Sequence, residues 1–264
     1  MVTRLLKRTE WTEDSYAAVR AEAAGLLESG TWLESTVTDK QTLLDKARRN
    51  GERIHLGDLL TLCSIKFAER EAAFQKHKGR ICFRGDNVKD ENGAAAVFQE
   101  MSAAPTAIQA VNANIAYGCF PGHKSTTCDA VRAYVQSLLK SKHKTWVRIP
   151  KELWPASWKG RYTAPMCLLD KALYGHPESG GHWENHLTEA VKAMGGSPVA
   201  EHPSSFWFEA TKLLLTVYVD DLLLSGPSSS HAAFWETLRR GKFPIACDEP
   251  EPLSRFLGRD HVAL

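Results

Sequence analysis

The stretch Lys212–Gly226, with the sequence KLLLTVYVDDLLLSG, decides the fold predicted for this chain. Apolar, β-prone runs lie on both sides of Asp220 and Asp221, which predicts a strand, a tight turn and a second strand. A two-residue hairpin turn favours Asn-Gly or Asp-Gly, because glycine adopts a positive φ at little cost. Two adjacent carboxylates repel each other. The pattern therefore indicates either a solvated acidic turn or part of a site for a hard cation, Mg²⁺ or Mn²⁺.

Composition limits the classes of protein to which the chain can belong. The 264 residues suffice for a substantial core, and 43% hydrophobic with 24% charged residues is ordinary for a globular protein. A net charge of +2 gives no global attraction for nucleic acid, so any such partner must bind local basic patches. The six cysteines are scattered and lack the C-x-x-C spacing of zinc or redox sites. Without a secretory signal or an apolar run of about 20 residues, we expect an intracellular protein, cytoplasmic or nuclear, with no membrane partner.

Hydrophobic periodicity predicts alternating helical and extended segments along the whole chain. We expect helices over residues 12–30, 39–54, 94–117 (broken near Pro105), 183–194 and 231–240. We expect strands over residues 31–37, 59–67, 79–84, 146–149, 166–169 and 204–209. Lys78 and Arg80 occupy alternate positions of one strand, so they share a face. Such a face either contacts phosphate or is simply exposed to solvent.

Asp129 lies where a short polar and apolar segment ends and a run with helical spacing begins. The spacing of Val131, Val135, Leu138 and Leu139 predicts a helix there. An aspartate at such a junction is ordinarily a helix N-cap. Its alternative role is that of a third carboxylate beside the acidic turn, which local sequence does not decide.

The ordered set of motifs resembles the reverse transcriptase domain of Ty1/copia-type LTR retrotransposons, from about Ala23 to the end of the chain. Tyr218-Val-Asp-Asp is similar to the catalytic tetrad of that family, and Asp129-Ala-Val-Arg-Ala-Tyr-Val is similar to the motif with its first catalytic aspartate. The remaining similar motifs occur in the family's order. They are Gly30-Thr-Trp, Lys78-Gly-Arg-Ile, Lys171-Ala-Leu-Tyr-Gly, Trp183 and Phe256-Leu-Gly.

The resemblance implies an α+β fold, with the palm and fingers of a right-hand polymerase and an antiparallel sheet backed by helices. On this basis residues 1–22 are an N-terminal extension and residues 23–264 form the fingers and palm, with the thumb missing or truncated. The chain is then expected to be a piece of a polyprotein. The implied activity is RNA-directed DNA polymerisation, with an RNA or DNA template and primer and deoxynucleoside triphosphates as partners. The oligomeric state stays open.

The resemblance also implies roles for individual residues. Asp129, Asp220 and Asp221 are the expected catalytic residues and ligands of Mg²⁺ or Mn²⁺, with Asp221 in a supporting role. Tyr134 is expected beneath the incoming sugar. The side chains of Lys78 and Arg80 are expected to neutralise the triphosphate.

The chain departs from the family pattern after Gly175. It continues His-Pro-Glu-Ser-Gly-Gly, and Glu178 replaces the glutamine that helps to position template and nucleotide in the family. An added negative charge near a triphosphate weakens binding unless a cation compensates it. Two alternatives to an active polymerase follow, a catalytically inactive nucleic-acid-binding remnant and an unrelated α+β domain with an acidic turn.

Overall fold

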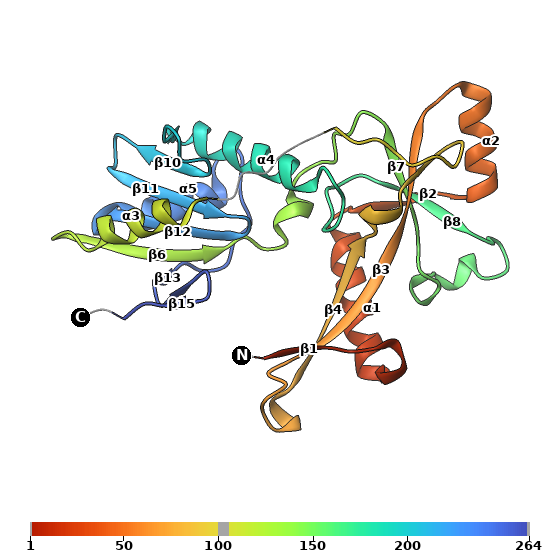
Figure 1. The fold of residues 1–264 in the computed structure, drawn as a ribbon, viewed down its shortest axis with the longest axis horizontal. Helices are drawn as coiled ribbons and strands as arrows, with labels where there is room; N and C mark the ends of the chain where they lie inside the picture. Colours follow the sequence, from red (N-terminus) through yellow and green to blue (C-terminus); the bar gives the residue numbers. More distant parts are fainter. Residues whose placement is uncertain (1, 100–105, 263–264) are drawn as a thin grey trace. The chain divides into compact units, whose positions relative to one another are not determined.

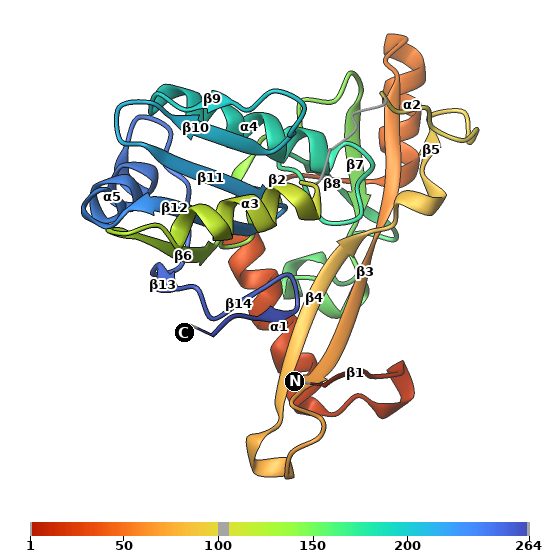
Figure 2. The same cartoon turned by 60° about the vertical axis from the view of Figure 1, so that its left-hand side comes forward.

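The computed structural model describes residues 2–99 and 106–262, which form helices and strands in two compact units (Figures 1 and 2). The first unit comprises Met1–Glu100 and Leu138–Ser179, and the second comprises Met101–Ser137 and Gly180–Leu264. Both units combine helices with sheets whose strand pairs are antiparallel except for one pair. The predicted α+β class is therefore confirmed.

The first unit contains a seven-stranded sheet with the order β1-β3-β7-β8-β2, in which β4 and β5 also pair with β3. Only β3 and β7 run parallel. The strands are β1 Thr3–Leu5, β2 Trp32–Asp39, β3 Ile54–Lys66, β4 Lys76–Phe83, β5 Lys89–Asp90, β7 Lys144–Arg148 and β8 Pro165–Leu169. The helices are α1 Glu13–Glu28 and α2 Lys40–Asn50. These elements confirm the predicted helices and strands in this part of the chain.

The long hairpin of β3 and β4 packs against α1, and a glycine makes the close approach possible (Figure 2). A Cβ atom at Gly79 would lie 2.4 Å from the carbonyl oxygen of Ala18 in α1, so no larger residue fits without moving backbone.

Residues 22 and 23, where the resemblance places the boundary between an N-terminal extension and the fingers, both lie inside α1.

The second unit contains an antiparallel six-stranded sheet with the order β13-β6-β12-β11-β10-β9. The strands are β6 His123–Asp129, β9 Ser197–Pro198, β10 Ser205–Phe208, β11 Leu213–Tyr218, β12 Asp221–Pro227 and β13 Glu251–Pro252. The predicted hairpin is thus β11 and β12, at the centre of this sheet. A separate small hairpin consists of β14 Arg255–Phe256 and β15 Arg259–Asp260.

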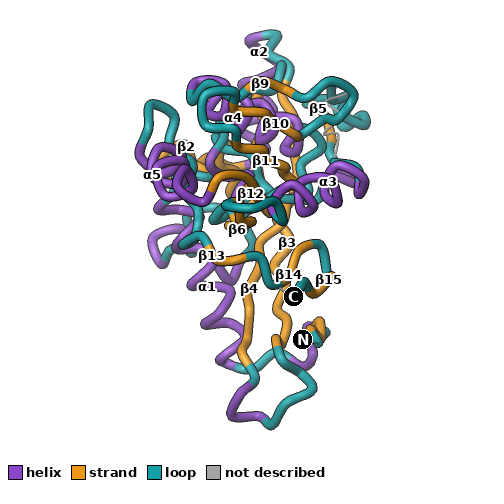
Figure 3. The backbone as a smooth tube through the Cα atoms, turned by 90° about the vertical axis from the view of Figure 1, so that its left-hand side faces the viewer, coloured by secondary structure: helices purple, strands orange, loops and turns teal. Residues whose placement is uncertain are grey.

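Helices cover both faces of the second unit's sheet, and Figure 3 shows α3 and α5 on opposite sides of it. The helices are α3 Ile108–Gly118, α4 Ser179–Ala193 and α5 His231–Arg240. Leu222 and Leu224 of β12 belong to the core formed with α4 and α5, whereas Leu223 packs with residues of α3. The alternation of side chains along β12 therefore gives the sheet two buried faces.

Two helix predictions are wrong in part. The helix predicted over residues 94–117 begins only at Ile108. Residues 94–96 are not helical, because Ala95 forms a bridge with Lys89 and the backbone groups of Ala94 and Ala96 bond to Asp90 and Val88. The helix predicted after Asp129 is a single short 3-10 turn, Ala133–Gln136, since nearby backbone and side-chain groups bond instead to Ala246. The predicted break near Pro105 lies outside the described residues.

Among the described residues, no helix is both long and apolar enough to cross a membrane.

The side chain of Asn114 connects α3 to the sheet of the second unit. It is fully buried, and its Nδ2 lies 2.8 Å from Thr216 Oγ1, 3.1 Å from the carbonyl oxygen of Leu214 and 3.2 Å from that of Leu223. We predict that Asn114→Ala lowers the free energy of unfolding by about 2 kcal/mol, because buried acceptors lose their donor. Urea unfolding followed by circular dichroism measures the change.

The exposed Asn112 on the same helix provides the control. Asn112→Ala is expected to change the free energy of unfolding by less than about 0.5 kcal/mol. Equal effects of the two substitutions would contradict the role assigned to the Asn114 amide.

Candidate active site

The hairpin of β11 and β12 closes through a two-residue turn made of Val219 and Asp220. Tyr218 pairs with Asp221, so Asp221 is the first residue of β12 and only one of the two acids lies in the turn. Val219 has a φ of 57°, a left-handed conformation that a β-branched residue adopts at an energetic cost. The turn therefore carries backbone strain beside the acidic residues.

A buried tryptophan holds the strained turn. Trp183 of α4 is 3% exposed, and its Nε1–H donates a hydrogen bond of 2.7 Å to the carbonyl oxygen of Val219. A buried hydrogen bond with this geometry is costly to leave unmade. Packing of α4 on the sheet and this hydrogen bond together fix the backbone that precedes Asp220.

Asp129 and Asp221 lie directly opposite each other at the end of β6 and the start of β12. The backbone N–H of Ala130 donates to the carbonyl oxygen of Asp220 at 2.7 Å, so Asp129 and Asp221 form a non-hydrogen-bonded pair. In such pairs the Cα atoms are only about 4.5 Å apart and the side chains project to the same face. The sheet thus brings together two carboxyl groups that are far apart in the chain.

The electrostatics show the cost of this arrangement. Burial, with the charges of Asp220 and Asp129, raises the pKa of Asp221 to about 6. Burial, with the charges of Asp220 and Asp248, also raises the pKa of Asp129. A hydrogen bond between the Asp129 and Asp221 carboxyl groups accompanies both shifts. The pair therefore favours sharing a proton when no cation neutralises it.

The donor set suits a hard divalent cation, since Asp129, Asp220 and Asp221 supply only carboxylate oxygens. In the part of the chain that the structure describes, no three acidic, histidine or cysteine side chains are already arranged to hold a metal ion. Burial, followed by the repulsion among the acids, raises the pKa values of Asp129 and Asp221, and a bound cation would remove the repulsion. Binding of a cation would require the proton shared by Asp129 and Asp221 to leave.

Tyr134 lies in the same unit as the three aspartates. It belongs to the 3-10 turn Ala133–Gln136 and packs, half-buried, against the apolar core that contains Trp183. Its expected place beneath the incoming sugar stays a prediction.

Lys78 and Arg80 lie in the first unit, on β4, opposite Ser64 and Leu62 of β3. Both are exposed, and with Lys66 they line a cavity of about 230 Å³. Burial, followed by the charges of Lys66 and Arg80, lowers the pKa of Lys78. The predicted basic face is therefore present, whereas its contact with a triphosphate stays a prediction.

Glu178, also in the first unit, is buried. Its carboxylate accepts a hydrogen bond of 3.0 Å from the backbone N–H of Gln99 and another from Ser141 Oγ. Glu178 lines a second cavity of the first unit, of about 360 Å³, together with the cationic side chains of Arg53 and Lys142. The buried carboxylate of Glu178 thus has two hydrogen-bond donors, whereas its predicted place near a template and nucleotide stays a prediction.

The sequence gives no sign of two further acids near Asp129. The backbone N–H of Asp248 donates to the carbonyl oxygen of Asp129 at 3.0 Å, and Glu251 lies on β13, the strand next to β6. The charges of both acids raise the pKa of Asp129. Neither residue belongs to a motif, so they are revealed by the bridge between Ala130 and Cys247, which precedes Asp248, and by the pairing of β13 with β6.

No protein-family model and no curated protein matches the chain. The family assignment therefore rests on the sequence motifs and stays a prediction.

We predict that Asp221→Asn stabilises the metal-free protein at pH 8 by about 1 kcal/mol, because it removes a like charge directly opposite Asp129. The pKa of Asp221, about 6, lies above its ordinary value, so the native state binds this proton more tightly than the unfolded chain does. The stabilising effect of the proton is complete below about pH 4 and is lost as the pH rises through about 6. The gain from the substitution should therefore vanish at pH 4.

Thermal unfolding in the presence of a chelator measures this gain at each pH. Glu189→Gln, an exposed carboxylate on α4, serves as the control and should show no pH-dependent gain. A destabilised Asp221→Asn protein at pH 8 would contradict the repulsion.

Proposed function

We propose that the chain is the reverse transcriptase domain of a copia-type retroelement, with the palm in the second unit and the fingers in the first. The proposed reaction is RNA-directed DNA polymerisation by nucleotidyl transfer. The observation that carries the proposal is the pairing of Asp129 with Asp221, next to Asp220, at one end of an antiparallel sheet. Sequence motifs that resemble those of the family, in the family's order, support the same assignment.

Nucleotidyl transfer requires the carboxylates to hold divalent cations. Two bound Mg²⁺ ions would supply activation of the primer 3′-hydroxyl and stabilisation of the charge that develops on the phosphates. Asp129 and Asp220 are the residues proposed to hold the ions directly, and Asp221 supports them. The carboxylates of Asp129 and Asp221 must give up their shared proton for this role, and burial with the neighbouring acidic charges raises the pKa of both groups, that of Asp221 to about 6.

Roles in substrate binding are proposed for three individual residues. Tyr134 is proposed to limit the space at the sugar, so that a ribose 2′-hydroxyl is rejected. Lys78 and Arg80 are proposed to bind triphosphate or template phosphate through charge-assisted hydrogen bonds. The exposed basic face of β4 also supports the second candidate function, a nucleic-acid-binding remnant without catalysis.

Primer extension on an RNA template tests the proposal. The full chain with oligo(dT) on poly(rA), dTTP and Mg²⁺ should add nucleotides, and chelation should stop the reaction. Asp129→Asn and Asp220→Asn should each lower the rate at least about a hundredfold, because several kcal/mol of charge stabilisation are lost. The rate should also fall below about pH 6, where Asp221 holds its proton.

Glu189→Gln, which removes an exposed charge on α4, should extend primers at the wild-type rate. Unchanged extension by Asp220→Asn would refute the site assignment. Salt-sensitive binding of template and primer without incorporation by the wild-type chain would favour the remnant instead.

A further inference from the structure

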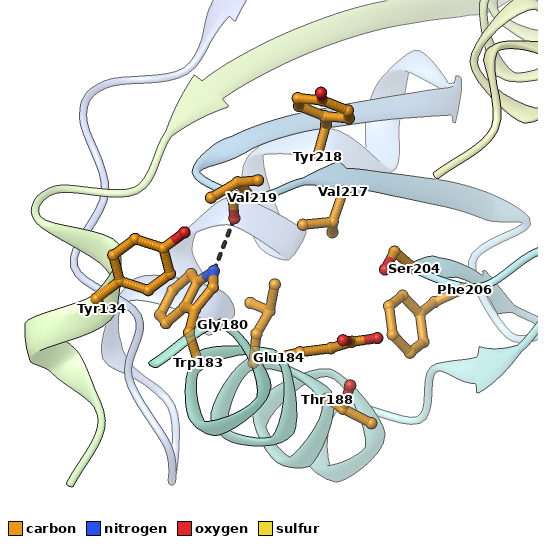
Figure 4. Close-up of a pocket in the computed structure, with 11 residues that line it drawn as sticks. Tyr134, Gly180, Trp183, Glu184, Thr188, Ser204, Phe206, Val217, Tyr218 and Val219 are labelled. Atoms are coloured by element: carbon orange, nitrogen blue, oxygen red, sulfur yellow. Dashed lines mark hydrogen bonds between the residues drawn. The ribbon is translucent and has the colours of Figure 1, made fainter. Parts of the chain in front are cut away.

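A cavity of about 270 Å³ lies between α4 and the strands β10 and β11 of the second unit (Figure 4). Its walls are mainly apolar and come from Trp183 and Leu187 of α4, Phe206 of β10 and Val217 of β11. All four are at least nine-tenths buried. Val219, in the strained turn, also lines the cavity.

The cavity is on the opposite face of the sheet from the Asp129 and Asp221 carboxylates. Val217 belongs to the core on the α4 face, together with Leu222 and Leu224. Asp221 and Leu223 alternate with those leucines along β12, and Leu223 packs on the α3 face. A ligand in the cavity would therefore not compete for the proposed metal ligands, although Tyr134, which is proposed to lie at the sugar, also lines the cavity.

The size of the cavity selects a fused two-ring ligand. An apolar cavity of about 150 Å³ holds benzene, and pockets for drug-sized ligands begin at about 300 Å³. At about 270 Å³ the cavity fits a molecule between these limits. The ring faces of Trp183 and Phe206 favour an aromatic occupant, because stacked or edge-to-face rings gain energy beyond their buried area.

Two polar side chains of α4 determine which substituent the ring should carry. Glu184 and Thr188 also line the cavity, one helical turn apart, and in Figure 4 both have oxygen atoms on the side of Ser204 and Phe206. A carboxylate and a hydroxyl both accept hydrogen bonds from an ammonium group. We propose that the cavity binds a flat bicyclic aromatic amine, with its ring against Trp183 and Phe206 and its ammonium group at Glu184.

Such a ligand would contact both partners of the hydrogen bond that holds the catalytic turn. Trp183 and Val219 line the cavity, and the 2.7 Å hydrogen bond between them fixes the residue before Asp220. Occupation of the cavity would change the environment of the Trp183 Nε1–H directly. Any effect of the bound amine on primer extension rests on the proposed function, whereas binding of the amine in the cavity does not.

Tryptamine is the probe, and 3-ethylindole is its neutral analogue of the same shape. Each is titrated into the ¹⁵N-labelled full chain, and the tryptophan Nε1–H signals are followed by NMR. Trp183→Phe identifies the Trp183 signal by its loss. We expect both probes to shift this signal saturably, with tryptamine binding about fivefold more tightly than 3-ethylindole, as for a partly exposed ion pair.

The variants separate the roles of charge and volume. Glu184→Gln should weaken tryptamine binding about fivefold and leave 3-ethylindole unchanged, whereas Glu189→Gln, on the exposed side of α4, should change neither. Thr188→Trp should fill the cavity and abolish the binding of both tryptamine and 3-ethylindole. The proposal is overturned if neither probe moves the Trp183 signal, or if Glu184→Gln leaves the preference for tryptamine intact. These outcomes do not depend on whether the chain extends primers.

Discussion

The opposition of Asp129 and Asp221 across β6 and β12 is the constraint on which the candidate site depends. At about 4 Å two like charges repel by about 1 kcal/mol in water and by more where water is displaced. The two residues cannot separate, because Leu222, Leu223 and Leu224 are completely buried on the two faces of the sheet. A slip of one residue in β12 would turn each leucine to the other face. Packing thus imposes the repulsion, and a proton or a cation must relieve it.

The turn at Val219 and Asp220 follows from the same register. Once Asp221 pairs with Asp129 and Tyr218 pairs with Asp221, only two residues remain to reverse the chain, and the first of them must take a positive φ. Glycine would do so without strain, but here it is valine, at a φ of 57°. The buried Trp183 hydrogen bond and the apolar contacts of the turn offset part of that strain. A strained, over-determined turn fixes the position of Asp220 more tightly than a flexible one would.

The central hairpin could be predicted from the sequence because apolar runs on both sides of an acidic pair leave few alternatives. Local pattern did not decide the role of Asp129, since its neighbours Val131 and Val135 have helical spacing but form no helix. The backbone N–H of Val131 donates to Ala246, and Val135 lies in a short 3-10 turn. Only the resemblance to a family suggested Asp129 as a third acid. Asp248 was not predicted at all, because its proximity to Asp129 depends on strand pairing between distant segments. Burial of Glu178 was equally invisible, as its donors come from separate segments.

The two faces of the second unit's sheet divide the possible functions between them. On the α3 face Asp129 and Asp221 meet in a charged cluster, whereas on the α4 face the sheet packs against Trp183, Leu187 and Phe206 around an apolar cavity. The turn at Val219 and Asp220 takes part in both. The carbonyl oxygen of Val219 accepts the hydrogen bond from Trp183, and the carboxylate of Asp220 belongs to the acidic cluster. A ligand that displaces Trp183 or Val219 would also move the backbone next to Asp220. If a cation binds at the acids and a ligand binds in the cavity, as proposed above, the two binding events would be coupled through Trp183 and Val219, and by linkage equally in both directions.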